Sequence, residues 1–320
     1  MSTGPNAFPD PVPRVVAIVG PTASGKSDLG MALAKAWPEG AEIVCCDSMQ
    51  VYTGLDIGTG KPTTDDRTSI PHHLLDVARP DEAFHAGAWA RCAGQVIAGI
   101  TARGRLPVIV GGTGLYFRAL TRGLFEAPPP DAGIRSRHQA EAARGGVPAL
   151  HARLAGIDPD AAAKIAPNDL VRTSRALEVW EQTGRPITAL WREAAAVPPL
   201  RCFRVVYDKP SDELRGLIDR RVDTMMAMGF LDEVRGLWAQ GFREARALGG
   251  LGYKQLGEHL AGACDLSSAI AETKRVTVAY ARRQRTWFRQ EPGLRVTASP
   301  PLADIMTQIR AFFEGCDDPL

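Results

Sequence analysis

The chain has 320 residues, of which 45% are hydrophobic and 23% are charged, a composition typical of a globular protein. This excludes a wholly disordered chain, a collagen and a small disulfide-stabilised protein, and the length predicts about two domains. The formal net charge is only +2, from 38 Lys and Arg against 36 Asp and Glu. A uniformly basic protein that coats nucleic acid is therefore disfavoured, although a local basic patch is compatible with this total.

The N-terminal residues carry no recognisable targeting signal. Residues 1–13 contain four prolines and no apolar segment like that of a signal peptide, so we expect a disordered tail there. The sequence has no run of about 20 apolar residues that would cross a membrane. Its six cysteines form no Cys-x-x-Cys pair, so neither a zinc site nor a disulfide framework is expected. These features predict a cytoplasmic protein that does not bind membranes.

Four short apolar segments alternate with stretches of helical character. The second segment ends at Asp47, and the third runs into a Gly-Gly-Thr-Gly sequence that contains Thr113. This alternation is typical of a mostly parallel α/β sheet, which binds ligands beyond the carboxyl ends of its strands. Gly20, Asp47 and Thr113 all follow strands and are predicted to line one crevice. The four predicted strands are residues 14–19, 43–46, 107–110 and 202–207.

Two proline clusters, at 128–130 and 198–199, bracket a segment of different composition. This segment is rich in Ala and Arg and poor in β-branched residues, which predicts a helical insertion in the α/β core. The residues that follow the fourth strand are also largely helical in pattern. The predicted division is a core of residues 14–130 and 198–297, an insertion of residues 131–197 and a C-terminal tail of residues 298–320.

The loop after the first strand matches the P-loop pattern Gly-x-x-x-x-Gly-Lys-Ser in full. The backbone N–H groups of such a loop wrap a phosphate chain, and the following helix directs its positive end at the same phosphates. Lys26 adds a positive charge, and the Ser27 hydroxyl is the predicted ligand of Mg²⁺. The loop alone does not distinguish a nucleoside triphosphate from a diphosphate ester. The predicted phosphate-binding residues are Gly20, Pro21, Thr22, Ala23, Ser24, Gly25, Lys26 and Ser27.

The residues that would complete the site are unusual for a nucleotide hydrolase. Such an enzyme would show an acidic residue that holds Mg²⁺ and a residue that positions water. Here Asp47 is followed by Ser48, Met49 and Gln50, and the third strand ends without an acidic residue. This pattern favours a site that binds a diphosphate together with a polar acceptor. A helix N-cap is the alternative interpretation of Asp47.

Eight motifs run in order over most of the chain. They are GPTASGKS at 20–27, DSMQVYTGLDIGTGKP at 47–62, PHHLLD at 71–76, GGTGLY at 111–116, SRALEV at 174–179, MGFLDEV at 228–234, GYKQL at 252–256 and ARRQRTWFR at 281–289. Together they resemble the tRNA dimethylallyltransferases, a family also called tRNA isopentenyltransferases. The resemblance implies a P-loop NTPase-like core with a helical insertion and a helical C-terminal part, and a tRNA anticodon arm that lies across core and insertion.

The resemblance also implies an activity. A dimethylallyl group would move from dimethylallyl diphosphate to the exocyclic amine of an adenosine beside the anticodon, with Mg²⁺ present. The P-loop would hold the diphosphate, and Lys26 and Arg221 would stabilise it as it leaves. Thr113 would contact the reacting groups. Asp47 would accept a proton from the amine, which is otherwise a weak nucleophile.

Contacts with the tRNA follow from the same resemblance. The target base must leave its stack to react, and Ser48 and Gln50 would then hydrogen-bond the adenine edge. This chain departs from the family pattern at Leu170-Val171, where many members have Pro-Gln, and at Lys254, where arginine is usual. The implied tRNA-binding residues are Asp47, Ser48, Met49, Gln50, Thr113, Arg135, Val171, Arg172, Thr173, Ser174 and Arg175.

One segment near the C-terminus is strongly basic, although the net charge of the whole chain is close to zero. Residues 273–290 contain six Lys and Arg side chains and no Asp or Glu. Arg275, Arg282 and Arg289 are spaced by seven, so on a helix they share one face. Contact with RNA phosphates is the favoured interpretation of this charge density. The residues of this segment predicted to bind tRNA are Arg282, Arg283 and Arg285.

Three alternative functions are compatible with the P-loop. A small-molecule kinase would need a nucleotide base pocket and a lid with catalytic arginines. An adenylate isopentenyltransferase would act on a free nucleotide and would have little use for the helical insertion or the basic helix. A nucleotide-dependent RNA-binding switch would hydrolyse GTP or ATP at the loop. A monomer is the expected state of association.

Overall fold

The computed structural model describes residues 13–124, 128–194 and 200–314. The chain divides into two compact units, of which the first consists of Met1–Thr121 and Leu200–Leu320 and the second of Arg122–Pro199. The predicted insertion, residues 131–197, falls within the second unit. The predicted N-terminal tail lies outside the described residues except for Pro13. Among the described residues, no helix is both long and apolar enough to span a membrane.

The first unit is built on a parallel sheet of six strands. The strands are β1 (Arg14–Val19), β2 (Ala41–Cys46), β3 (His72–His73), β4 (Leu106–Gly111), β5 (Arg201–Tyr207) and β6 (Leu294–Val296). Their order in the sheet is β3-β2-β4-β1-β5-β6, and every neighbouring pair is parallel. In this register Ile18 lies opposite Val110 on one side and Val205 on the other. The predicted mostly parallel α/β sheet is confirmed.

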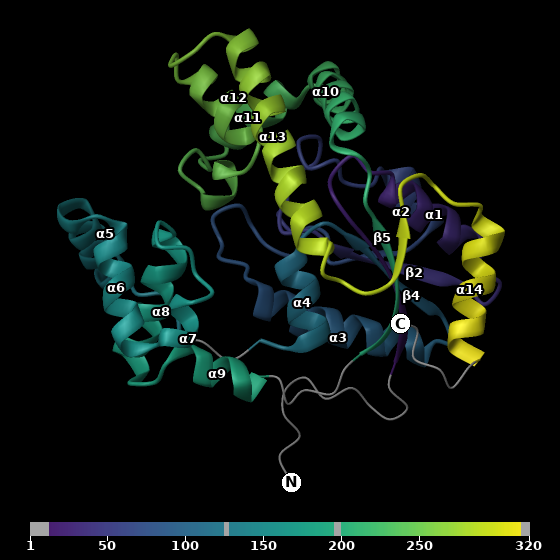
Figure 1. Cartoon of the computed structure of the whole chain (residues 1–320). Helices are drawn as coiled ribbons and strands as arrows, with labels where there is room; N and C mark the ends of the chain where they lie inside the picture. The colour runs from purple at the N-terminus through teal and green to yellow at the C-terminus, as the bar shows by residue number, and fades with distance from the viewer. Residues whose placement is uncertain (1–12, 125–127, 195–199, 315–320) are drawn as a thin grey trace. The chain divides into compact units, whose positions relative to one another are not determined.

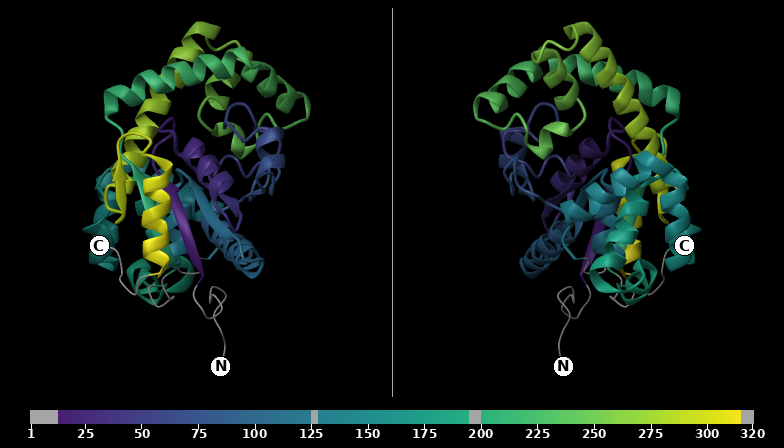
Figure 2. Two further views of the ribbon diagram at one scale, coloured as in Figure 1. Left: turned by 90° about the vertical axis from the view of Figure 1, so that its right-hand side faces the viewer. Right: turned by 90° about the vertical axis from the view of Figure 1, so that its left-hand side faces the viewer.

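Helices cover both faces of this sheet (Figures 1 and 2). On one face, Ile18 and Val110 share a core cluster with α1 (Lys26–Ala36) and α14 (Leu302–Glu314). On the other face lies α3 (Ala86–Ala102), whose Trp89 donates from Nε1 to the Cys45 carbonyl of β2 (3.0 Å). Because both faces are covered, the central strands read as continuous apolar segments. These continuous apolar segments are the pattern from which the strands are predicted in the sequence.

The C-terminal residues of the chain differ from the expectation. Residues 298–320 are predicted as a tail, but α14 lies within them and packs Ile305, Ile309 and Phe312 into the core. These residues recur at the i, i+4, i+7 spacing of an amphipathic helix. The Phe312 ring lies 5.6 Å from that of Phe203 in β5. The sheet would lose part of its cover without this helix.

Four α-helices between β5 and β6 lie beyond the carboxyl ends of the strands (Figure 1). They are α10 (Ser211–Ala227), α11 (Phe230–Ala239), α12 (Tyr253–Leu260) and α13 (Leu266–Phe288). Asp265 caps α13 by accepting from Ser268 N (2.8 Å). The helices α10 and α13 pack on each other through Ile218, Val222 and Val278. This packing brings the basic segment to the same end of the sheet as the P-loop.

The described residues of the second unit form helices joined by short loops, as its composition predicts. Its helices are α5 (Ala132–Gly145), α6 (Val147–Ile157), α7 (Pro159–Ala162), α8 (Leu170–Thr183) and α9 (Ile187–Ala194). Leu150, Leu154 and Leu177 are fully buried in a core that belongs to this unit alone.

Candidate functional site

The predicted P-loop connects β1 to α1 at the carboxyl end of the sheet. Lys26, the first residue of α1, donates from Nζ to the Pro21 carbonyl (3.1 Å). Burial lowers the pKa of Lys26 to about 8, against the opposing effect of the Asp47 charge. The buried Ser24 Oγ has no hydrogen-bond partner among the described residues. Phosphate oxygens would satisfy both of these groups.

A cavity of about 990 Å³ extends from this loop within the first unit. Lys26, Asp47 and Arg221 all line it, among other charged residues, so cationic side chains and carboxylates share the cavity. Of the three residues predicted to line one crevice, Asp47 lines this cavity and Gly20 and Thr113 do not, although Thr113 accepts from the N–H of Ser48, the residue after Asp47 (2.9 Å). Gly20 precedes the part of the P-loop that lines it. The arrangement is suited to an anion at one end and a proton donor at the other.

Asp47 is fixed by the turn that follows β2. Its Oδ1 accepts from Met49 N (2.8 Å) and Gln50 N (3.3 Å), the pattern of a side chain that caps a turn. Within the described chain, both of these hydrogen bonds go to Oδ1, which leaves Oδ2 for a ligand. The capping interpretation and the proton-acceptor interpretation are therefore compatible, because each uses a different oxygen.

Thr113 sits at a junction of three segments. Its Oγ1 accepts from Ser48 N (2.9 Å) and donates to Ser48 Oγ (3.3 Å), while its own N–H donates to the Cys46 carbonyl (3.2 Å). The side chain also hydrogen-bonds Tyr280 of α13, whose pKa is raised to about 12 by burial. Thr113 thus ties the ends of β2 and β4 to α13.

Arg221 comes from α10 and is largely buried beside the cavity. Burial lowers the pKa of its guanidinium, and the charges of Asp47 and Asp28 oppose this effect. Its Nη2 donates to the Thr59 carbonyl (3.4 Å). Because an arginine keeps its charge in such a setting, the guanidinium can stabilise an anion in the cavity.

Gln284 is a structural link that sequence reasoning did not single out. Its Oε1 accepts from Thr22 N in the P-loop (2.9 Å), and its Nε2 donates to the Gly112 carbonyl (2.8 Å). The residue therefore connects α13 to both loops of the site. Its position in the ARRQRTWFR motif was the available signal, but only the arginines of that motif suggested a role.

The predicted arginines of α13 have different surroundings. Arg282 and Arg283 are exposed, and the Arg283 guanidinium lies over the Tyr280 ring (5.7 Å to the centroid). Arg285 is instead paired with Asp208 and donates to Ser211 Oγ (2.9 Å). The first two present their charges to solvent, whereas Arg285 also holds α13 to the loop after β5.

The predicted tRNA-binding residues of the second unit lie on α5 and α8. Arg135 and Arg175 both pair with Glu178, which is completely buried (Nε to Oε1, 3.2 Å; Nη1 to Oε2, 2.6 Å). Val171 is 79% exposed, and Arg172 is also exposed. The remaining two predicted residues, Thr173 and Ser174, are buried, so their side chains do not lie on the surface of this unit.

The histidine pair of the PHHLLD motif has a structural explanation. His73 Nε2 lies 2.6 Å from Oε2 of the buried Glu42, which Arg103 also contacts (2.7 Å). His72 Nδ1 lies 2.7 Å from the Ile70 carbonyl. These contacts fix the edge strand β3 to β2.

Two family models match this chain. The model described as IPP transferase covers residues 50–291, and that described as Isopentenyl transferase covers residues 13–81. The chain is 43% identical to the tRNA dimethylallyltransferase of Geobacter sulfurreducens, over 94% of this chain and 97% of the relative. It is 48% identical to that of Anaeromyxobacter sp. (strain K), over 90% and 93%.

Solved structures agree with these matches. The tRNA isopentenylpyrophosphate transferase of Bacillus halodurans is 37% identical, with a TM-score of 0.66 over 94% of this chain and 95% of that one. A eukaryotic dimethylallyltransferase acting on tRNA is 26% identical, with a TM-score of 0.68 over 86% and 70%. The matching model, the relatives and the P-loop site lead to one conclusion: the chain belongs to the IPP transferase family.

Proposed function

We propose that this chain transfers a dimethylallyl group from dimethylallyl diphosphate to the exocyclic amine of the adenosine adjacent to the anticodon in tRNA, releasing diphosphate. Membership of the family supports this activity. The observation that carries the chemistry is that the side chains of Lys26, Arg221 and Asp47 line the same cavity. One end of this cavity suits the leaving diphosphate, and the other suits the attacking amine.

The leaving diphosphate is stabilised at the P-loop end. When the allylic carbon–oxygen bond breaks, its electron pair goes to the diphosphate oxygen. Backbone N–H groups at the start of α1, the Lys26 ammonium and the Arg221 guanidinium face the charge that develops there. The unpaired Ser24 hydroxyl supplies one further donor.

Mg²⁺ fits the donor groups at this loop. The Ser27 hydroxyl is exposed at the first turn of α1 and belongs to the part of the loop that lines the cavity. It is an oxygen ligand, which Mg²⁺ prefers and supplements with phosphate oxygens and water. When bound, the ion would neutralise charge on the diphosphate. Ser27 is the residue proposed to hold it.

The acceptor amine is activated at the Asp47 end. The amine lone pair forms the new carbon–nitrogen bond, and the proton that the nitrogen then loses passes to the Asp47 carboxylate. Oδ1 is held by the turn, so Oδ2 is the proposed acceptor of this proton. Ser48 and Gln50 flank Asp47 in the same turn and supply polar groups for the edge of the flipped adenine.

The exposed arginines of α13 and of the second unit are proposed to hold the tRNA. Arg282 and Arg283 lie on the helix that also carries Gln284, which contacts both loops of the site. Arg172 of α8 is also exposed, and its guanidinium pairs with the Asp169 carboxylate that caps the same helix (3.5 Å). Contacts of exposed arginines with phosphates give affinity without reading sequence. The anticodon arm is the proposed ligand of these side chains.

One assay separates this proposal from its alternatives. The protein is incubated with labelled dimethylallyl diphosphate, Mg²⁺ and either unmodified tRNA or AMP. Transfer of label to tRNA and not to AMP is the expected result. Transfer to AMP alone would identify an adenylate isopentenyltransferase, and ATP turnover without any transfer would indicate a kinase or a nucleotide switch.

We also propose that the chain acts as a cytoplasmic monomer. One copy contains the P-loop, the Asp47 carboxylate and the basic helix, which supports a monomer as the active form. Analytical ultracentrifugation is expected to give the mass of one chain, both for the protein alone and with dimethylallyl diphosphate added.

A further inference from the structure

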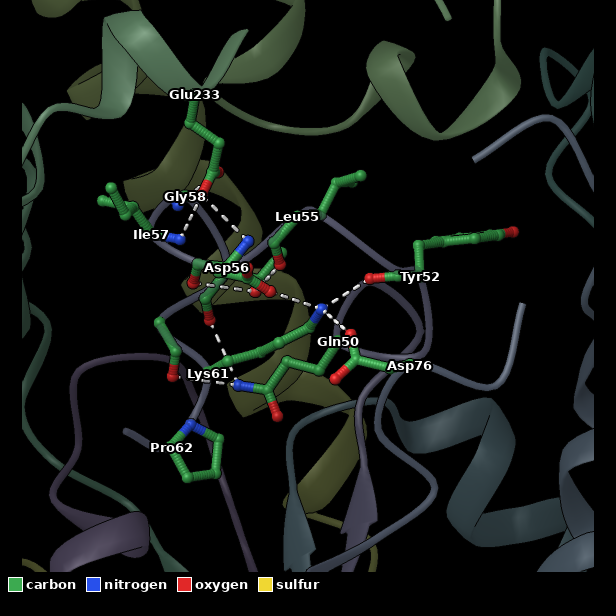
Figure 3. A network of polar contacts seen from close by, with 12 residues as sticks. Gln50, Tyr52, Leu55, Asp56, Ile57, Gly58, Lys61, Pro62, Asp76 and Glu233 are labelled. Carbon is green, nitrogen blue, oxygen red and sulfur yellow. Dashed lines mark hydrogen bonds and ion pairs between the residues drawn. The ribbon is translucent and has the colours of Figure 1, made fainter. Parts of the chain in front are cut away.

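The loop Asp56–Lys61 is held by one carboxylate that comes from a distant helix (Figure 3). Glu233, in the first turn of α11, accepts from three successive backbone N–H groups. Its Oε2 accepts from Asp56 N (3.0 Å) and Ile57 N (2.6 Å), and its Oε1 accepts from Gly58 N (3.1 Å). Three consecutive donors directed at one anion make a strong, charge-assisted contact.

The same loop is packed tightly against the helices that carry this carboxylate. Gly58 lies against the rings of Phe230 and Tyr253, so a Cβ at this position would come within 2.1 Å of the Phe230 ring. Tyr253 also donates its hydroxyl to Glu233 Oε1 (2.6 Å), and burial together with the Glu233 charge raises the pKa of this phenol. Any change in Glu233 is therefore transmitted to the loop through both hydrogen bonds and packing.

The other side of the loop meets two residues of the proposed site. The carbonyl groups of Thr59 and Gly60 accept from Gln50 Nε2 (3.2 and 3.1 Å). The Thr59 carbonyl also accepts from Arg221 Nη2 (3.4 Å). A Cβ at Gly60 would lie 2.1 Å from Arg221 Nη2, so the loop backbone sets how closely the guanidinium can approach.

Lys61 closes the loop at its base. Its side chain is 1% exposed, and its Nζ donates to the Tyr52 carbonyl (2.5 Å), to Asp56 Oδ1 (2.7 Å) and to Asp76 Oδ1 (2.5 Å) (Figure 3). With both of its ends held in this way, the loop behaves as a rigid spacer between Glu233 and Arg221.

We propose that Glu233 is a positioning residue, which sets the Asp56–Lys61 loop and through it the places of the Arg221 guanidinium and the Gln50 amide. The proposal rests on the proposed function, in which Arg221 faces the leaving diphosphate and Gln50 the adenine. Glu233 touches neither substrate. Its contribution is to hold the Arg221 guanidinium near the leaving group and the Gln50 amide near the acceptor base. Misplacing such groups by about 1 Å can slow a reaction about 100-fold.

The first test is Glu233→Gln, which keeps the shape of the side chain. The amide has one oxygen in place of two and presents an NH₂ group to donors of the loop. We expect the single-turnover rate of transfer to tRNA to fall about 10- to 100-fold, while the Kd for tRNA stays within about twofold. The matched control is Asp232→Asn, which removes the neighbouring carboxylate of the same helix turn, where Asp232 pairs only with the exposed Arg235 among the described residues. This control is expected to leave the rate unchanged.

A double-mutant cycle shows whether Glu233 acts through Arg221. The readout is the Kd of inorganic diphosphate with Mg²⁺, measured by calorimetry, because it needs no turnover. We expect Glu233→Gln to weaken diphosphate binding in the wild-type background and to have little further effect in Arg221→Lys. If the two effects multiply, or if Glu233→Gln leaves both rate and Kd unchanged, the positioning role is wrong.

Tyr253→Phe keeps the test valid if Glu233→Gln does not fold. It removes only the hydroxyl that donates to Glu233, and we expect a smaller weakening of diphosphate binding that also disappears in Arg221→Lys. An effect that persists there would contradict the proposal. Failure of the proposed function is distinct, since the wild-type protein would then transfer no label to tRNA.

Discussion

At the scale of single residues, Asp47 combines a structural contact with a proposed chemical one. Its Oδ1 accepts from Met49 N and Gln50 N, and these contacts fix the rotamer of the carboxylate without using its second oxygen. A proton acceptor must be held in reach of the reacting nitrogen. The turn after β2 therefore supplies the orientation that the proposed chemistry requires.

Replacing Asp47 tests these two contributions separately. Asp47→Asn keeps an oxygen that can cap the turn but cannot accept the proton, so we expect the single-turnover rate to fall by about 10²-fold or more with tRNA affinity nearly unchanged. Asp47→Ala is expected to show the same fall in rate. Because the turn also loses its capping oxygen, the free energy of unfolding should fall by about 1 kcal/mol. Rate assays and thermal unfolding distinguish the two variants. An Asn variant with the wild-type rate would exclude Asp47 as the base.

Lys26 gives a prediction for pH. Its pKa is lowered to about 8, so the free protein loses this charge as the pH rises through 8. If the ammonium binds the diphosphate, the Kd should weaken up to about tenfold per pH unit above that value. Calorimetry with inorganic diphosphate from pH 7 to 10 measures this. In Lys26→Met, the Kd should change with pH only through the ionisation of diphosphate itself. If the plots of Kd against pH for the wild type and this variant are parallel, Lys26 does not bind the diphosphate through its charge.

At the scale of elements, sequence patterns located those segments that carry a motif or a long apolar repeat. The helix expected after the P-loop is present and spans Lys26–Ala36, because its start is set by the P-loop motif. The strands β3 and β6 were missed, since two and three residues are too few to show a pattern.

The contacts of Gln284 and Glu233 cannot be predicted from sequence patterns, for a different reason. Gln284 bonds a residue 262 positions away and Glu233 one 177 positions away. Only the folded chain brings these partners together. The motifs marked both segments as notable, but neither spacing nor periodicity says which backbone group a side chain will meet.

The helix α13 carries the prediction on tRNA binding. Arg282 is exposed and makes no ion pair among the described residues, so its charge is available to phosphates. We expect Arg282→Ala to weaken tRNA binding and to reduce the slope of log Kd against log salt by about 1. Filter binding at several salt concentrations measures the slope. Arg310→Ala, which changes an exposed arginine of α14, is the control and should leave it unchanged.

At the scale of the whole molecule, the net charge and the chain length do not show how the charges and the compact units are distributed along the chain. The net charge of +2 is an average that includes the acid-free segment 273–290. The two-domain estimate corresponds to two compact units, but the second is inserted in the first and does not follow it. Each unit has a core of its own. The cavity lined by the P-loop lies in the first unit, and Arg172 lies in the second.

This division predicts that the two binding functions can be damaged separately. Leu154 is fully buried in the core of the second unit, so Leu154→Ala should cost that unit about 2–5 kcal/mol. We expect faster amide exchange in α6 and α8 and weaker tRNA binding, with the Kd of diphosphate unchanged. Phe312→Ala, in the core of the first unit, is the matched variant and should speed exchange in β5 and α14 while sparing α6. Parallel loss of diphosphate binding in Leu154→Ala would contradict this prediction and would indicate that the two units do not unfold independently.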